Sequence, residues 1–443
     1  MSKYTREDII RIVEEEDVEF IRLQFTDIRG AFKNVAITSS QLEKALDNQF
    51  MFDGASIGFV EIEESDMYLH PDLDTFAIFP WRPQQGKVAR LICDVYYPDG
   101  RPYEGDPRYI LKKVLREAEQ MGYRFNAGPE CEFFLFECDE AGLPTTRTRE
   151  KAGYFDMGPV DTAENVRRDI VLNLEELGFE VESSHHEGAP GQHEVDFHYE
   201  EALKTADNVM TFKLTVKSIA RRHGLHATFM PKPVKGIAGS GMHINMSLYD
   251  ADGKNAFADD GDENGLSMTA YQFIAGIMNH AAAMTALTNP IVNSYKRLIP
   301  GYEAPVYITW ARNNRSPLIR VPVTRDGNVR IEMRSPDASA NPYLALAVCL
   351  EAGLDGIRNK MTPPPKFEMN LFAMQENEVA IRGIERLPEN LGDAIDALEE
   401  DELIRGILGS YAFPRYVQAK KIEWKEYCAQ ITQWEVQQYL NEL

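Results

Sequence analysis

The sequence predicts an α+β protein of about two or three domains, for three reasons. The chain has 443 residues, more than one simple hydrophobic core usually accommodates. Its first part is rich in short alternating strand patterns, whereas its last part is mostly helical in pattern. The turn-rich stretch Pro98-Asp99-Gly100-Arg101-Pro102 lies between them. We therefore predict one domain over 1–102 and a second over 103–443.

Alternating runs predict about four strands in the first 102 residues. Thr5 is a typical helix cap, and Ser40-Gln41-Leu42-Glu43 has the pattern of a capping box that begins another helix. The segment 52–56 has little periodicity and is expected to be a loop. The predicted strands cover 20–26, 32–37, 76–80 and 88–96, and the first predicted helix covers 5–17.

Helical periodicity marks five segments of the larger part. Asp106-Pro107 begins the first of them, because Asp caps a helix and Pro fits its first turn, and Gly122 ends it. Asn341-Pro342 begins another in the same way. The other three are predicted over 163–177, 207–223 and 267–287, and the chain from 363 onward is predicted to be mostly helical.

The charge balance and the apolar pattern exclude several classes of partner. The formal net charge is -23, which argues against nucleic acid or an anionic membrane. Five cysteines without paired zinc spacing fit reduced thiols. The sequence shows neither a signal peptide nor an apolar run long enough for a membrane span. We expect a cytoplasmic protein that binds neither nucleic acid nor membrane.

The stretch Gly128-Pro129-Glu130-Cys131-Glu132-Phe133 predicts a strand with two acids on one face. At strand spacing the two carboxylates are about 7 Å apart and repel by about 2 kcal/mol at an effective dielectric near 20. The apolar run that follows would desolvate both carboxylates and raise this cost, unless cations lie in front of them. Glu130 and Glu132 are therefore candidate cation ligands.

Three further stretches also gather polar groups on one face of a strand. A single such stretch is better explained by an amphipathic strand facing water, but four of them favour a metal site. Carboxylates with one imidazole suit Mg²⁺ or Mn²⁺ better than zinc. His185-His186 is either a zinc half-site or, as we favour, includes a structural hydrogen-bonding residue. The three stretches are 184–197, with two pairs of His and Glu; 241–248, with His243, Asn245 and Ser247; and 329–334, with Arg330, Glu332 and Arg334.

Arginines provide the complementary charge. Seven of them, from Arg297 to Arg334, fall within 38 residues of a strongly acidic chain. Ordinary surface charge would explain some of them, but several stand at strand spacing among apolar residues. Arginines combined with divalent metals stabilise a transferring phosphoryl group. The residues therefore indicate metal-dependent phosphoryl transfer, with ATP as the expected donor, on a scaffold that lacks a P-loop motif.

Taken together, the motifs resemble the bacterial type I glutamine synthetases, of the alpha subtype found in Gram-positive bacteria. The resemblance extends over nearly the whole chain. The matching stretches include Phe52-Asp53-Gly54, Gly128-Pro129-Glu130-Cys131-Glu132, His186-Glu187, Gly191-Gln192-His193-Glu194, Gly239-Ser240-Gly241-Met242-His243, Asn293-Ser294-Tyr295-Lys296-Arg297, Pro300-Gly301-Tyr302-Glu303-Ala304-Pro305, Asn314-Arg315-Ser316 and Asn341-Pro342-Tyr343-Leu344.

This resemblance implies an N-terminal β-grasp domain and a catalytic domain with a curved antiparallel sheet flanked by helices, the glutamine synthetase/guanido kinase type of fold. It also implies a site of two or more Mg²⁺ or Mn²⁺ ions, with ATP as co-substrate. One metal is expected on Glu130, His243 and Glu332, and a second on Glu132, Glu187 and Glu194; glutamate on Gly239, Arg297, Glu303, Arg315 and Arg334; and ATP near Glu182, Phe197, Ser247, Arg315, Arg320 and Arg330.

The implied reaction is the ATP-dependent ligation of ammonia to L-glutamate through γ-glutamyl phosphate, with Asp53, Glu303 and Arg315 as catalytic residues. Asp53 would come from a neighbouring subunit of a homo-dodecamer, two hexameric rings with shared active sites. A γ-glutamyl ligase for another amine, such as a polyamine, is the alternative, and a nitrogen-response transcription regulator is a candidate partner. Glu61, where Gram-positive relatives carry an arginine, and Ala238, where they carry asparagine, depart from the family pattern.

Overall fold

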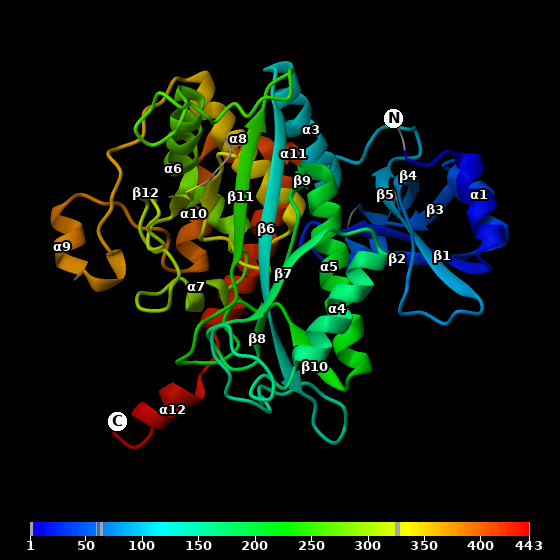
Figure 1. Cartoon of the computed structure of the whole chain (residues 1–443), viewed down its shortest axis with the longest axis horizontal. Helices are drawn as coiled ribbons and strands as arrows, with labels where there is room; N and C mark the ends of the chain where they lie inside the picture. Colours follow the sequence, from blue (N-terminus) through cyan, green and yellow to red (C-terminus); the bar gives the residue numbers. More distant parts are fainter. Residues whose placement is uncertain (1–2, 59, 63–64, 324–327, 375, 443) are drawn as a thin grey trace.

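A computed structural model describes residues 3–58, 60–62, 65–323, 328–374 and 376–442. The described chain forms two sheets that lie side by side, a small one near the N-terminus and a large one through the middle of the molecule (Figure 1). Helices cover the large sheet, and the C-terminal helix extends away from the body (Figure 1). Each sheet has its own hydrophobic core.

The small sheet has five strands in the order β2-β1-β5-β4-β3. The central strand β5 is parallel to its neighbour β1, while the other pairs are antiparallel. Helix α1 packs its buried face, Ile9 and Val13, into this core. The elements are α1 (Arg6–Glu15), β1 (Val18–Thr26), β2 (Phe32–Thr38), α2 (Leu42–Leu46), β3 (Phe50–Asp53), β4 (Asp66–Ile78) and β5 (Lys87–Tyr96), with 3₁₀ turns at Ser39–Gln41 and Ala55–Ile57.

Three sequence predictions for this part were wrong. The segment 52–56 is not a loop throughout, because Phe52 and Asp53 pair with Met67 and Asp66 in the β3–β4 ladder. The short apolar run of β3 was too brief to reveal its alternation. Strand β4 begins ten residues before the predicted 76, since the buried Met67 and Leu69 of its first half alternate with only partly buried or exposed residues and gave a weak apolar signal. The capping box does not form: Gln41 is the N-cap of α2 and makes no side-chain cap bond.

The large sheet has the order β12-β13-β14-β11-β6-β8-β7, with β9 and β10 also paired to β6. It is antiparallel, as expected, apart from the edge pair β12–β13, which is parallel. The long strand β6 borders four other strands and is therefore the axis of the sheet. The strands are β6 (Arg124–Glu137), β7 (Val181–His186), β8 (Gln192–Phe197), β9 (Glu200–Glu201), β10 (Leu225–Thr228), β11 (Met242–Tyr249), β12 (Trp310–Arg312), β13 (Ile319–Val321) and β14 (Ile331–Met333).

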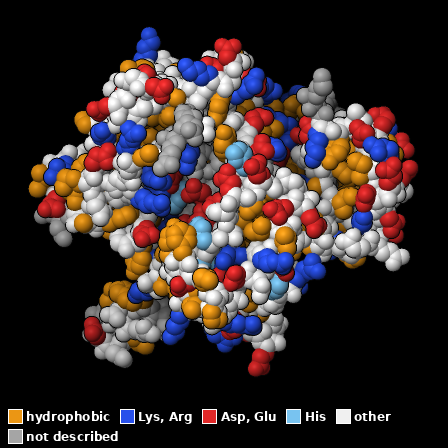
Figure 2. Space-filling model, in the orientation of Figure 1, with side chains coloured by type: hydrophobic (Ala, Val, Ile, Leu, Met, Phe, Trp, Pro, Cys, Tyr) orange, Lys and Arg blue, Asp and Glu red, His pale blue; other side chains and the backbone are white. Residues whose placement is uncertain are grey.

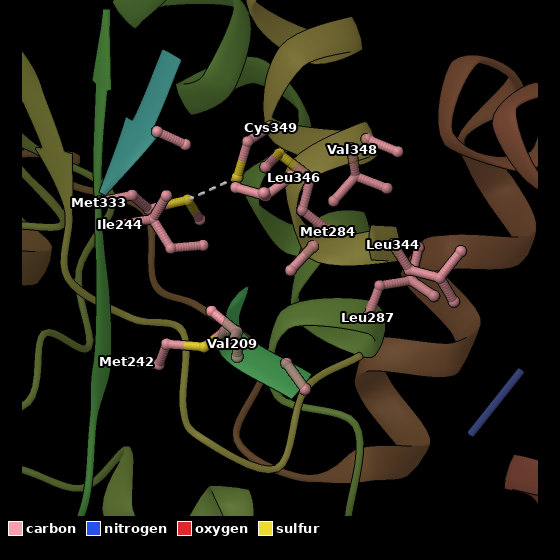
Figure 3. Packing of buried hydrophobic residues seen from close by; sticks show 14 of the residues in the cluster. Val209, Met242, Ile244, Met284, Leu287, Met333, Leu344, Leu346, Val348 and Cys349 are labelled. Atoms are coloured by element: carbon pink, nitrogen blue, oxygen red, sulfur yellow. Dashed lines mark hydrogen bonds between the residues drawn. The ribbon is translucent and has the colours of Figure 1, made fainter. Parts of the chain in front are cut away.

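Helices pack behind the face of the large sheet that carries its apolar side chains. Ile244 and Met333 point from β11 and β14 toward Cys349 and its neighbours on α8 (Pro342–Arg358), and Met242 of β11 lies beside Val209 of α5 (Ala202–Arg222) (Figure 3). The predicted helices are present, although α5 begins five residues earlier than expected. The helices are α3 (Pro107–Gln120), α4 (Glu164–Glu176), α5 (Ala202–Arg222), α6 (Met268–Thr288), α7 (Ser294–Arg297), α8 (Pro342–Arg358), α9 (Glu376–Ile381), α10 (Leu391–Glu400), α11 (Glu402–Cys428) and α12 (Gln433–Tyr439), with a 3₁₀ turn at Leu371–Ala373.

A buried arginine joins the two parts of the chain. Arg108, near the start of α3, is almost fully buried and bonds Asp72 and Asp94 of the small sheet. Its guanidinium also bonds Asp207 of α5, which accepts a hydrogen bond from the hydroxyl of Tyr343. Three carboxylates from both parts therefore converge on one cation.

Candidate active site

The first predicted metal group is assembled by strand register. His243 on β11 lies opposite Glu130 on β6. Two residues further along β11, Asn245 lies opposite Glu332 on β14. Nδ1 of His243 is 3.4 Å from Glu130 Oε2 and 3.7 Å from Glu332 Oε1. One donor atom from each of the three residues lies within 4.8 Å of the others. This spacing would allow one small cation to contact all three.

Arginines surround this group. Arg320 and Arg334 each donate to one oxygen of Glu332, so both oxygens of that buried carboxylate are held by guanidinium groups. Burial, with the nearby charge of Arg334, lowers the pKa of His243 well below its ordinary value. The imidazole is therefore neutral, which is the form that ligates a metal.

A hydrogen-bond chain leads from this group to a neighbouring cavity. Nδ2 of Asn245 donates to Glu130 Oε1 at 2.8 Å, and Nε of Arg330 donates to Asn245 Oδ1 at 2.9 Å. Asn245 thus orients one predicted metal ligand and one predicted ATP-binding residue. The sequence placed it on the correct face of the strand but gave no sign of this bridging position.

A second group of donor atoms overlaps with the residues predicted for the second metal. Glu187 and Glu194 lie together, and the third donor within 4.8 Å is His185 instead of Glu132. The His185 ring nitrogens lie 3.5 Å from Glu187 Oε1 and 3.8 Å from Glu194 Oε2. Glu132 lies beside this group, opposite Glu194 in the β6–β8 register. Its Oε2 accepts hydrogen bonds from the Gln192 side chain at 2.8 Å and from the backbone of Gly241 at 2.9 Å.

Glu132 and the two carboxylates of the second group lie close enough to influence one another's protonation. Burial, together with the charge of Glu187, raises the pKa of Glu132 to about 7. Burial and the neighbouring Glu132 raise the pKa of Glu194 well above its ordinary value. Groups of this kind hold protons until a cation replaces them, as expected of metal ligands.

The two adjacent histidines have different surroundings. His185 faces the carboxylates and packs against the rings of Tyr154 and Phe155. His186 is fully buried, and its ring bonds Glu150 at 3.1 Å and the carbonyl of Glu187 at 2.7 Å. The sequence left two interpretations of the His185-His186 pair, a zinc half-site or a structural hydrogen-bonding residue. The contacts of His186 agree with the second, which we favoured.

A cavity of about 400 Å³ opens beside the first metal group. Acidic, basic and histidine side chains gather near the centre of this face, over β6 and β11 (Figure 2). Predicted ATP-binding residues line the cavity from β7, β8, β11 and the segment before β14, namely Glu182, Phe197, Ser247 and Arg330, with Glu130 at its edge. Arg320 contacts Glu332 instead, Arg315 does not line this cavity, and Arg325 of the arginine cluster lies outside the described residues.

The predicted glutamate-binding residues differ from one another in burial. Arg297 is buried and donates to the carbonyl oxygens of Arg334, Ser335 and Pro336. Its guanidinium passes Gly241 so closely that a Cβ there would lie 2.6 Å from Nη2, which explains the glycine. Arg315 is exposed. Glu303 is also exposed, on a loop where its φ is +57°.

Asp53 lies apart from the other predicted catalytic residues of the same chain. It ends β3, and this strand belongs to the small sheet at the side of the molecule (Figure 1). Its carboxylate is exposed and accepts hydrogen bonds from Ser56 and from the backbone of Ala55. The hydrogen bonds from Ser56 lower the pKa of Asp53, so it is ionised.

Comparison with known proteins agrees with this geometry. Residues 17–98 match the model of the glutamine synthetase beta-Grasp domain, and residues 104–439 match that of the glutamine synthetase catalytic domain. The chain belongs to the glutamine synthetase family. Glutamine synthetase of Clostridium saccharobutylicum is 62% identical over 442 residues and all of both chains, and that of Staphylococcus aureus (strain Mu50) is 57% identical over 441 residues and 99% of both.

Solved structures of the family share the fold. A GmaS/ADP complex aligns with a TM-score of 0.89 and 36% identity over 98% of this chain and 99% of that one. A glutamine synthetase of Plasmodium falciparum aligns at 0.87 and 25% identity over 99% of each. These matches confirm the expected β-grasp and catalytic folds. Among the described helices, none is long and apolar enough to cross a membrane.

As a member of this family, the chain is a glutamate–ammonia ligase that forms glutamine. Its substrates are glutamate, ammonium and ATP, and it uses divalent metal. The two groups of carboxylate and imidazole donors fit such metals, because hard cations prefer oxygen ligands. The alternative of another amine as substrate is not favoured by these relatives.

Proposed function

We propose that Glu130, His243 and Glu332 hold one Mg²⁺ or Mn²⁺, and that Glu132, Glu187 and Glu194 hold a second one, with His185 beside it. The observation that carries the proposal is the alternation along β6. It puts Glu130 and Glu132 on one face of the strand. The register then places Glu130 opposite His243 on β11 and Glu132 opposite Glu194 on β8, so each acid joins a different group. When bound, the metals neutralise phosphate charge and act as Lewis acids.

ATP is proposed to lie in the cavity beside Glu130. Glu182, Ser247 and Arg330 offer one acidic, one hydroxyl and one cationic contact there, and Phe197 offers an apolar one. Glutamate is proposed to bind at Gly239, Arg297, Glu303, Arg315 and Arg334. The side chains of Arg315 and Arg320 then balance charge as the glutamate γ-carboxylate attacks the γ-phosphorus and ADP leaves.

In the second step ammonia attacks the acyl carbon of γ-glutamyl phosphate and inorganic phosphate leaves. Asp53 is proposed to bind ammonium and to accept its proton. Since Asp53 belongs to the small sheet in this chain, we infer that it acts on the site of a neighbouring subunit. Its exposure supports this role, and it suits the proposed homo-dodecamer of two hexameric rings with shared sites. Glu303 would shield the acyl phosphate from water.

Three further proposals complete this function. The domain boundary is proposed between 102 and 103, just before the helix start at Asp106. The cytoplasm is the proposed compartment, because the five cysteines are unpaired in the structure. A nitrogen-response transcription regulator is the proposed macromolecular partner, to be tested by co-purification with and without glutamine.

Phosphate release from ATP tests the proposed chemistry. The assay contains glutamate with either ammonium or a polyamine, and Mg²⁺ or Mn²⁺ is supplied or removed by a chelator. We expect ammonium- and metal-dependent release. Release that persists in the chelated enzyme would contradict the metal assignment, and turnover with polyamine alone would contradict the choice of acceptor.

A further inference from the structure

A buried polar layer lies behind the second metal group. In the β7–β8 hairpin, His186 pairs with His193, and the two rings meet edge to face with centroids 4.8 Å apart. Neither side chain is exposed to solvent. Their chain neighbours Glu187 and Glu194 carry the donors of the second metal group. Whatever holds the two histidines therefore also fixes the backbone from which these donors project.

Glu150 holds His186. Its side chain is only 4% exposed, and its Oε1 accepts a hydrogen bond from Nε2 of His186 at 3.1 Å and another from the backbone of Gly191. Its Oε2 accepts from the backbone of Ala152. The other ring nitrogen of His186 bonds the carbonyl oxygen of Glu187 at 2.7 Å. One carboxylate thus connects the start of the 150–156 loop, the β7–β8 turn and the backbone of a metal-group residue.

The same loop covers His185. The backbone of Phe155 donates to the carbonyl of His186, and the rings of Tyr154 and Phe155 pack on His185. Because Glu150 bonds this loop at Ala152 and the turn at Gly191, it sets the loop and the turn relative to each other. Loss of the Glu150 carboxylate would free both sides of the second metal group.

His193 is held separately. Nη1 of Arg167 donates to Asp161 and to Nδ1 of His193, the latter at 3.1 Å. Donor atoms of Asp161, His186 and His193 lie within 4.8 Å of one another, a spacing that would suit a third metal. The guanidinium of Arg167 already supplies the positive charge at two of these donors, so this layer does not need an ion.

We propose that Glu150 is a positioning residue for the second metal group. It acts through His186 and Gly191 on Glu187, and it contacts neither substrate nor metal. The proposal rests on the proposed metal function of Glu187 and Glu194. Residues behind metal ligands, when altered, typically change metal affinity by 10- to 100-fold. We expect a loss of this size at the second metal group and unchanged affinity at Glu130, His243 and Glu332.

The experiment is a Mn²⁺ titration of the purified enzyme without substrates, followed by electron paramagnetic resonance. The variants are Glu150→Gln and His186→Gln. In Glu150→Gln the amide replaces one acceptor oxygen with a donor, so at least one of three N–H groups loses its partner. The matched control is Asp169→Asn, which alters the exposed pair of Asp169 and His223, 2.8 Å apart.

We expect two bound Mn²⁺ ions in the wild type and in Asp169→Asn. In Glu150→Gln we expect one of them to bind at least about tenfold more weakly, with turnover recovering at high Mn²⁺. Should Glu150→Gln not fold, His186→Gln gives the same readout. Its amide can donate to only one of the two oxygens that the imidazole contacts, Glu150 Oε1 and the carbonyl oxygen of Glu187. Two sites of wild-type affinity, or an equal loss at both, would overturn the positioning role. Absence of Mn²⁺ binding in the wild type would instead overturn the metal assignment itself.

Discussion

Glu132 on β6 lies directly opposite Glu194 on β8 in the antiparallel register. Both carboxylates are buried, and Glu187 from the neighbouring hairpin lies close enough to raise the pKa of Glu132 further. Like charges at directly opposite positions destabilise a sheet. This arrangement is stable when protons or cations are shared among the three acids, so the fold is coupled to metal binding at this point.

Metal binding at this group should weaken as the pH falls below about 7. A metal binds the ionised carboxylate, whereas the pKa of Glu132 is raised to about 7, so protons compete with the metal below this pH. Isothermal titration with Mn²⁺ at pH 6, 7 and 8, in buffers of different ionisation enthalpy, measures both the affinity and the protons released. Affinity that stays constant from pH 6 to 8 without proton release would contradict the raised pKa.

Replacing Glu332 by Ala should lower turnover by at least about 100-fold, because loss of a direct ligand should cost no less than loss of a residue behind a ligand, which costs about 10- to 100-fold. The change removes one donor of the first metal group and leaves Arg320 and Arg334 without their shared carboxylate. Initial rates of phosphate release in saturating Mg²⁺ and Mn²⁺ measure the loss. Asp139→Asn, in an exposed turn, serves as the control. Activity within tenfold of the wild type would refute Glu332 as a ligand.

Mixed subunits test whether Asp53 acts across a subunit interface. Asp53→Ala and Glu332→Ala should each be inactive alone. After joint unfolding and reassembly, a shared site receives both intact residues about one time in four, so about a quarter of wild-type activity should return. If Asp53 acted within its own chain, no site would regain both residues, and the mixture would stay inactive.

Arg108→Met should destabilise the protein by about 3–5 kcal/mol. It would leave the buried Asp207 and the half-buried Asp72 and Asp94 without their shared cation. Chemical denaturation followed by fluorescence measures the change. Arg101→Met is the control, because its pair with Asp99 is exposed and should contribute little. Equal effects of the two substitutions would contradict the idea that Arg108 joins the two parts of the chain.

His280 should make stability depend on pH. Burial opposes its charge, but hydrogen bonds from its ring to Asp401 and Asp355 raise its pKa above the ordinary 6.5. Its contribution is therefore complete below pH 6.5 and is lost as the pH rises through the raised pKa. The unfolding free energy of the wild type should exceed that of His280→Gln by about 1–3 kcal/mol at pH 6 and by less at pH 9. A difference that grows with pH would contradict this sign.

Much of the fold and the first metal group could be predicted because alternation along a strand fixes which side chains share a face. Alternation indicated the strand face that carries each of Glu130, His243 and Glu332. Only the register of the three neighbouring strands was then required to bring these residues together. The apolar patterns of α3, α6 and α8 likewise predicted these helices directly. What the pattern could not supply was pairing between distant segments.

The unpredicted features depend on such pairing. His185 joins the second group because it lies opposite Glu194 in the β7–β8 register, a pairing that the sequence alone does not show. Glu150 stands in a segment without periodicity, and its role appears only from what its carboxylate contacts. Strand β3 was missed because four residues are too few to show a period.

The central claim is that the alternation of β6 sets two metals side by side. Anomalous diffraction from crystals grown with Mn²⁺ tests it most directly. We predict two peaks in each subunit, one contacting Glu130, His243 and Glu332 and the other contacting Glu132, Glu187 and Glu194. In Glu130→Gln only the first peak should weaken. A single peak bridging Glu130 and Glu132, or peaks away from these residues, would contradict the account.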